Sequence, residues 1–172
     1  MTSGLTRRRL SIVGLALGAV GLAPASHAQE APNAVLDRLV GDWVMAGDVR
    51  GKPVTYRLHT QRVLKGAWVR LDMVDGQAPP DYEASLYIGY DSKAGDFVAH
   101  WLDQFGAAGA RVVATGRLAE GRLVLDFPYA EGAFRDTFSF AGPDAWSLVI
   151  EGQEKDGGWS PFARYAVSRA GR

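Results

Sequence analysis

Gly41-Asp42-Trp43 marks the point at which the pattern of the sequence changes from helical to β. In residues 31–40, just ahead of it, apolar side chains recur at helical spacing behind Pro32, which a first helical turn tolerates. After it, short apolar or alternating runs are separated by glycine-containing turns, a pattern typical of β-strands. We therefore expect one short N-terminal helix followed by an all-β domain.

Ten strands are expected in the rest of the chain, and nearly all of their connections have the composition of hairpin turns. A meander of hairpins builds an antiparallel sheet, and closing that sheet removes its exposed edges. The sequence therefore predicts a single antiparallel up-and-down β-barrel of about ten strands. The expected strands are residues 43–49, 54–63, 67–73, 82–90, 97–103, 112–118, 122–127, 133–140, 145–152 and 162–169.

The G-x-W opening, the number of strands and Arg169 on the last strand together resemble the calycin superfamily of lipocalins, fatty-acid-binding proteins and nitrobindin-like barrels. Ten strands favour the fatty-acid-binding or nitrobindin-like branch. The nearest likeness is to uncharacterised bacterial lipocalin-like families, which are domains of unknown function. The resemblance implies that Trp43 closes the barrel floor and that Arg169 lies across its ring. It covers residues 29–172, which we expect to form one domain.

Residues 1–28 have the features of an export signal peptide. Arginines at positions 7–9 precede an apolar run, residues 12–23, that is shorter than the roughly 20 residues of a membrane-spanning helix. Ser26-His27-Ala28 supplies small residues before a cleavage site at Gln29. Adjacent arginines ahead of a glycine-containing apolar run are typical of a twin-arginine signal, and the general secretory route is the alternative. We expect a periplasmic or secreted bacterial protein without a membrane anchor after cleavage.

The composition of the mature region excludes several classes of partner and chemistry. Removal of residues 1–28 takes away three arginines and no acidic residue, which turns a neutral chain into one with a net charge of −3. A weakly acidic domain without a basic cluster argues against nucleic acid or an anionic membrane surface as partner. The chain has no cysteine, so we expect no disulfide and no thiolate chemistry. The oligomeric state is left open.

The sequence lacks the residues that bind haem or fatty acids in the families it resembles. Nitrobindin-like barrels hold haem through a histidine on a late strand, and no histidine follows His100. Fatty-acid-binding proteins clamp a carboxylate with Arg-x-Tyr on the last strand, whereas Arg164 and Tyr165 are adjacent and face opposite sides of the sheet. We therefore expect no haem, no other cofactor and no metal. Without a Gly-x-Ser-x-Gly elbow, no catalytic residue is assigned.

Aromatic side chains are the strongest indication of a binding site. Five tryptophans and six tyrosines suit a cavity for a small amphipathic molecule, and they suit plain packing equally well. Alternation puts His100 and Trp101 on opposite faces of one strand without saying which face is inner. Loops 75–81 and 104–110 are expected at the barrel mouth. The candidate ligand-binding residues are Tyr56, Tyr87, His100, Trp101, Arg135 and Tyr165.

The function that these features predict is the binding, without chemistry, of a small apolar or amphipathic molecule by an exported barrel. One alternative is a cavity enzyme, an isomerase or hydrolase that uses His100 or a tyrosine. The other is a packed structural or interaction module, since a barrel of this size can be filled by its own side chains. The volume and the lining of the barrel interior distinguish between the binding barrel, the cavity enzyme and the packed module.

Overall fold

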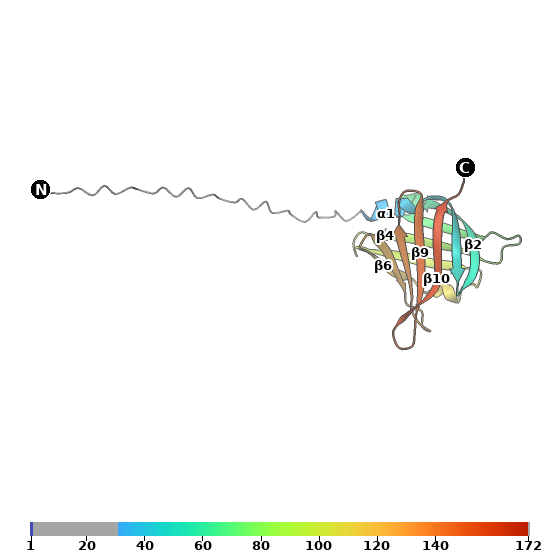
Figure 1. Ribbon diagram of the computed structural model, residues 1–172. Coiled ribbons are helices and arrows are strands. Elements are labelled where there is room, and N and C mark those ends of the chain that lie inside the picture. The colour runs from blue at the N-terminus through green and yellow to red at the C-terminus, as the bar shows by residue number, and fades with distance from the viewer. Residues whose placement is uncertain (2–30, 172) are drawn as a thin grey trace.

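The computed structural model describes residues 31–171 together with Met1, and these residues form a closed antiparallel barrel with one short α-helix before it (Figure 1). Each strand pairs with its neighbour in sequence, and β1 closes the sheet against β10. The predicted all-β, ten-stranded, up-and-down barrel with an N-terminal helix is confirmed. The elements are α1 (Pro32–Leu39), β1 (Gly41–Val49), β2 (Lys52–Val63), η1 (Leu64–Gly66), β3 (Trp68–Asp75), β4 (Glu83–Asp91), β5 (Asp96–Asp103), η2 (Gly109–Arg111), β6 (Ala114–Ala119), β7 (Arg122–Phe127), β8 (Phe134–Phe140), β9 (Ala145–Gln153) and β10 (Trp159–Arg169).

The contact between β5 and β6 is the one place where strand pairing is much shorter than the sequence pattern predicts. β6 begins at Ala114, two residues after the expected start, since Val112 and Val113, which follow the 3-10 turn η2, pair with no strand among residues 31–171. Only residues 97–99 pair with residues 114–116, so the second half of β5 is paired with β4 alone. That half of β5 borders the barrel mouth and the loop that follows it.

Half of the barrel interior is a packed core. Side chains alternate between the interior and the outside along each strand, as the pleat of a β-sheet requires. In the half nearer the start of β1, the void left between the inward side chains is about 20 Å³, close to the space of a single water molecule. These side chains are Met45, Leu58, Leu71, Leu86, Phe138, Trp146 and Leu148.

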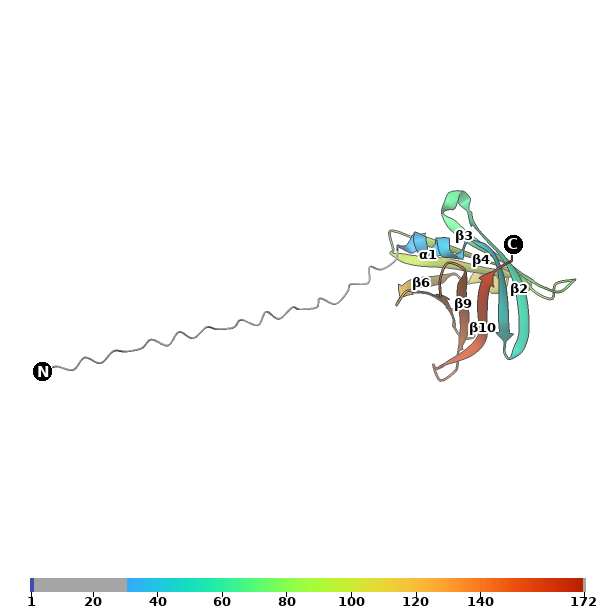
Figure 2. The same cartoon turned by 45° about the horizontal axis from the view of Figure 1, so that its top comes forward.

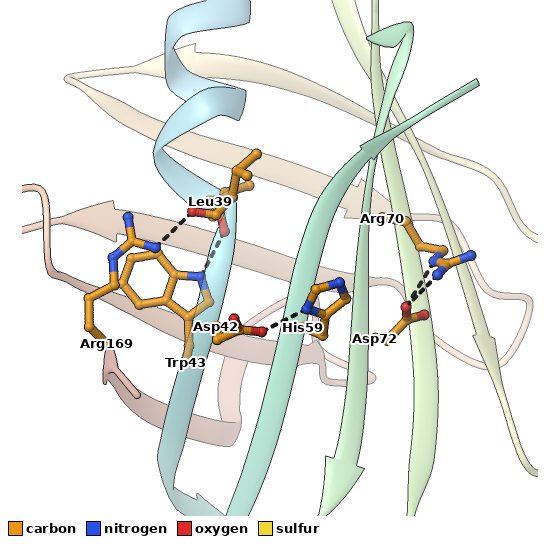
Figure 3. A network of polar contacts seen from close by, with 8 residues as sticks. Leu39, Asp42, Trp43, His59, Arg70, Asp72 and Arg169 are labelled. Atoms are coloured by element: carbon orange, nitrogen blue, oxygen red, sulfur yellow. Dashed lines mark hydrogen bonds and ion pairs between the residues drawn. The ribbon is translucent and has the colours of Figure 1, made fainter. Parts of the chain in front are cut away.

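Trp43 closes the packed end of the barrel and is 1% exposed. Its indole N–H donates to the Leu39 carbonyl oxygen at 2.8 Å (Figure 3). The guanidinium carbon of Arg169 lies 3.7 Å from the indole ring centroid, and Nη1 of Arg169 donates to the Val40 carbonyl oxygen at 2.8 Å. At Gly41, φ is +137° and a Cβ would lie 1.7 Å from Arg169 Nη1, so glycine is needed there. The end of α1 is thereby tied to the first and last strands.

The helix α1 adds apolar surface to this closed end. Figure 2 shows α1 beside β3 and β4, and the three residues Val35, Leu36 and Leu39 are buried. Pro32 occupies the first turn, where its missing N–H leaves no helical hydrogen bond unmade. α1 is the one α-helix among the described residues, and the cavity lies at the opposite end of the barrel.

Candidate functional site

The half of the barrel opposite Trp43 is hollow. It contains a cavity of about 800 Å³, within the range of about 300 to 1,000 Å³ typical of small-molecule sites. The lining comes from the ends of β1, β3, β5, β7 and β9, from the beginnings of β2, β8 and β10, and from the loops between them, including Asp81 and Tyr82 just before β4. Its apolar wall consists of Val54, Met73, Phe127, Phe134, Ile150 and Phe162.

Aromatic side chains with polar tips form one side of the cavity. The ring of Tyr56 lies 6.0 Å from that of Tyr165 and 5.9 Å from that of Tyr82, measured between centroids. The indole N–H of Trp101 donates to the Tyr82 hydroxyl at 3.3 Å, and this hydroxyl donates to Asp103 Oδ2 at 3.4 Å. The second oxygen of Asp103 accepts from the backbone N–H of Phe105 at 3.0 Å. The Asp103 carboxylate is therefore hydrogen-bonded within the wall.

The cavity tyrosines are neutral at physiological pH, and burial shifts their pKa further from it. It raises the pKa of Tyr82 and Tyr165 well above the usual value for a phenol, and nearby acidic side chains add to the effect. Burial and the charge of Asp75 also raise the pKa of Tyr56. At neutral pH these hydroxyls stay protonated, so they can donate hydrogen bonds to a ligand but cannot act as bases.

Asp136 is the most unusual residue of the cavity wall. It is 2% exposed, and its cross-strand neighbours are the apolar Leu125 and Ile150. Burial, and secondarily the charge of Asp126, raises the pKa of Asp136 to about 8. Within residues 31–171 its carboxyl group makes neither a hydrogen bond nor an ion pair, in contrast to Asp103. The structure thus places an unpaired carboxyl group against the hollow interior.

The local sequence explains why Asp136 points inward. β8 alternates, with Phe134, Asp136, Phe138 and Phe140 on one face and Arg135 among the polar residues of the other. Asp136 therefore takes a position that belongs to an apolar series. That polar interruption of an aromatic alternation is the signal by which the sequence could have indicated Asp136, which is absent from the six predicted ligand-binding residues. Tyr82 and Tyr129, which also line the cavity, are absent from them as well.

Three of the six candidate ligand-binding residues, Tyr56, Trp101 and Tyr165, line the cavity. The other three lie on the outer wall, because they occupy the opposite parity of their strands. Tyr87 lies opposite Arg70 of β3 and His100 of β5 in the strand register. His100 Nε2 lies 2.6 Å from the Ala110 carbonyl oxygen, and Arg135 Nε donates to Asp126 Oδ1 at 2.7 Å. The His100 contact joins β5 to the loop that follows it, and the Arg135 contact joins β8 to β7 on the outer surface.

Charged residues surround the cavity mouth. Three exposed charged residues line its rim, namely Arg50, Lys52 and Asp81, and the exposed Phe105 lies beside them. Phe105, which belongs to loop 104–110, is 76% exposed, and its ring lies 5.9 Å from the ring of Tyr82. Both loops that we expected at the mouth contribute to it, since Asp81 ends loop 75–81. The positive charges lie at this rim, whereas the buried wall carries carboxyl groups.

Two negative findings concern residues 31–171. No group of three or more histidine, cysteine or acidic side chains in this part of the chain is arranged to hold a metal ion. None of its helices is both long and apolar enough to cross a membrane.

Together the fold and the cavity define a hollow ten-stranded barrel with a closed floor and an aromatic, acid-containing interior. Over residues 28–169 the chain matches the family described as "Protein of unknown function (DUF1579)", and it belongs to that family. No curated protein matches the chain.

Among solved structures, the chain is similar in fold to the S-type phycobiliprotein lyase CPES from Guillardia theta. The TM-score is 0.56 at 13% sequence identity, and the match covers 81% of this chain and 92% of the lyase. At this identity the similarity shows a shared fold.

Proposed function

We propose that this protein is an exported barrel that binds a small apolar or amphipathic molecule and performs no chemistry on it. The observation that carries the proposal is the cavity of about 800 Å³ at the open end of the barrel. A packed structural module would have filled that space with side chains, as the floor half of the same barrel is filled.

The lining favours an amphipathic ligand. Most of the cavity wall is aliphatic or aromatic, and apolar area removed from water contributes roughly 25 cal/mol per Å² to binding. A small number of fixed polar groups, among them the hydroxyls of Tyr56, Tyr82 and Tyr165, can orient a ligand. The fold shared with a phycobiliprotein lyase makes a bilin a reasonable probe ligand. Calycin membership, inferred from the G-x-W opening, is part of this proposal.

The cavity enzyme is the weaker alternative. His100, its first candidate residue, is on the outer wall with its Nε2 against the Ala110 carbonyl oxygen. The tyrosines that do line the cavity have a raised pKa and remain protonated, which suits hydrogen bonding more than proton abstraction. We therefore assign binding and leave the catalytic role unassigned.

The test is uptake of a neutral hydrophobic dye, Nile red, and of biliverdin by the purified protein, followed by fluorescence and by thermal shift. Val54 lines the cavity, and Val54→Trp should weaken Nile red binding at least tenfold by filling it. Val44, 37% exposed on the outer wall, supplies the matched control, because Val44→Trp leaves the cavity unchanged. Absence of uptake, or uptake that Val54→Trp does not alter, contradicts the proposal.

Export remains a proposal that rests on the sequence alone. The predicted signal peptide, residues 1–28, lies outside the residues that the structure describes, apart from Met1. Its arginines, short apolar run and small residues before Gln29 support a periplasmic or secreted location.

A further inference from the structure

The unpaired carboxyl group of Asp136 restricts the chemistry of the ligand. Asp136 is 2% exposed, lines the cavity and is flanked by the apolar Leu125 and Ile150 on the neighbouring strands. A buried polar group without a partner costs roughly 1 to 3 kcal/mol, and a buried unpaired charge costs more. An apolar residue at this position would continue the Phe134, Phe138 series without that cost. A ligand in the cavity could therefore supply the partner that Asp136 lacks among the described residues.

The surroundings of Asp136 favour a positively charged or N–H partner. The groups that act on it electrostatically are Asp126 from β7, Tyr129 from the loop before β8 and Tyr165 from β10, and none is a cation. Among the described residues that line the cavity, the cationic ones are Arg50 and Lys52, both at the exposed rim. The deep wall thus offers hydrogen-bond acceptors and π-faces, and it offers no cation to pair with an anion.

Aromatic rings next to this carboxyl group strengthen the same preference. The rings of Tyr129 and Phe134 meet edge to face at 5.9 Å, and Phe127 stacks on Tyr129 at 6.1 Å. All three line the cavity, as does Tyr165. An ammonium group over an aromatic face gains roughly 0.5 to 2 kcal/mol, depending on how far it is desolvated.

We propose that the ligand of this cavity is an amphipathic amine, whose nitrogen donates to the Asp136 carboxyl group while its apolar part lies against the aromatic wall. This inference rests on the proposed function and adds the chemical class of the ligand.

The protonation balance of this binding step gives a specific signature. Because burial raises the pKa of Asp136 to about 8, the carboxyl group of the empty protein is protonated at pH 7. A primary alkylamine is protonated in water at that pH. Formation of a carboxylate–ammonium pair therefore releases the Asp136 proton to the buffer, and the bound pair is neutral overall. Binding of an uncharged analogue releases none.

The experiment compares three probes of one shape, 4-phenylbutylamine, 4-phenylbutan-1-ol and 4-phenylbutyric acid, by titration calorimetry on the purified protein. Calorimetry in buffers of different ionisation enthalpy at pH 7 counts the protons released. We expect the amine to bind at least tenfold more tightly than the alcohol, with release of close to one proton. In Asp136→Asn the preference and the proton release should both disappear. Asp91→Asn, the same change at an exposed turn outside the cavity lining, should keep both.

Each outcome of the calorimetry either supports or overturns the inference. Equal affinities for amine and alcohol, or tightest binding of the acid, overturn the inference. If Nile red still binds in the cavity, the proposed function stands although the inference of an amine ligand fails. If Nile red also fails to bind, the proposed function fails as well. The wild-type comparison needs no variant, so it decides the question even where Asp136→Asn does not fold.

Discussion

Replacing Asp136 by asparagine should stabilise the protein, and the gain should depend on pH. Asparagine has nearly the same shape and cannot ionise, so it removes the cost of a buried charge. In the unfolded chain an aspartate has its ordinary pKa of 3.8, whereas in the folded barrel burial raises the pKa of Asp136 to about 8. The folded state therefore binds more protons than the unfolded state between these two values.

The sign of the effect follows from this difference. Stability contributed by the protonated carboxyl group is complete below pH 3.8 and is lost as the pH rises to about 8. A difference of about 4 pKa units, at 1.36 kcal/mol each, gives an upper value of about 5 kcal/mol for the loss. That is a large fraction of the roughly 5 to 15 kcal/mol by which a domain is stable. Asp136→Asn should thus match the wild type near pH 4 and exceed it increasingly up to pH 8.

Urea denaturation at pH 4, 6, 8 and 9, monitored by tryptophan fluorescence, measures the difference in unfolding free energy between variant and wild type. Asp81→Asn is the control, because an exposed rim carboxyl group should change stability by less than about 0.5 kcal/mol. A difference for Asp136→Asn that stays constant from pH 4 to pH 9 would refute the reasoning. It would mean that the carboxyl group is solvated or paired in the folded protein.

Two further predictions concern the barrel floor and export. Trp43→Ala should cost roughly 3 to 5 kcal/mol, because the indole is buried and holds the end of α1; Arg169→Met, which keeps the aliphatic stem, should cost about 0.5 to 2 kcal/mol. Urea denaturation measures both, and a Trp43→Ala loss below that of Arg169→Met would contradict the assigned floor. Changing Arg7, Arg8 and Arg9 together to lysine keeps the charge of the signal and should abolish export by a twin-arginine route. Mass spectrometry of periplasmic and cytoplasmic fractions detects the mature chain that begins at Gln29, and normal export of the triple variant would instead indicate the general secretory route.

Much of the fold was predictable because it depends on local chemistry. The hairpin turns and the alternation after Trp43 predict ten antiparallel strands, and the structure has them. The predicted start of β6 is two residues too early because Val112 and Val113 continue the apolar pattern of the strand but pair with no neighbouring strand in the described part of the chain.

The candidate site was predictable only in part, since alternation pairs residues on a face without saying which face is inner. On β5, His100 and Trp101 were both candidate ligand-binding residues. In the closed barrel Trp101 points inward and lines the cavity, whereas His100 points outward. Arg135 and Asp136 show the same ambiguity on β8. On β8 the Arg135 side chain points outward and contacts Asp126. Because neighbouring side chains of a strand alternate, Asp136 points to the inner wall.

The sequence by itself determined the strand order and the short helix, because turns, alternation and a helix boundary are local properties of the chain. The tertiary structure alone decided that one half of the barrel is packed and the other hollow, and that the hollow half contains Asp136. The physical reason is that volume and burial depend on how all ten strands close around one axis. No short stretch of sequence contains that information.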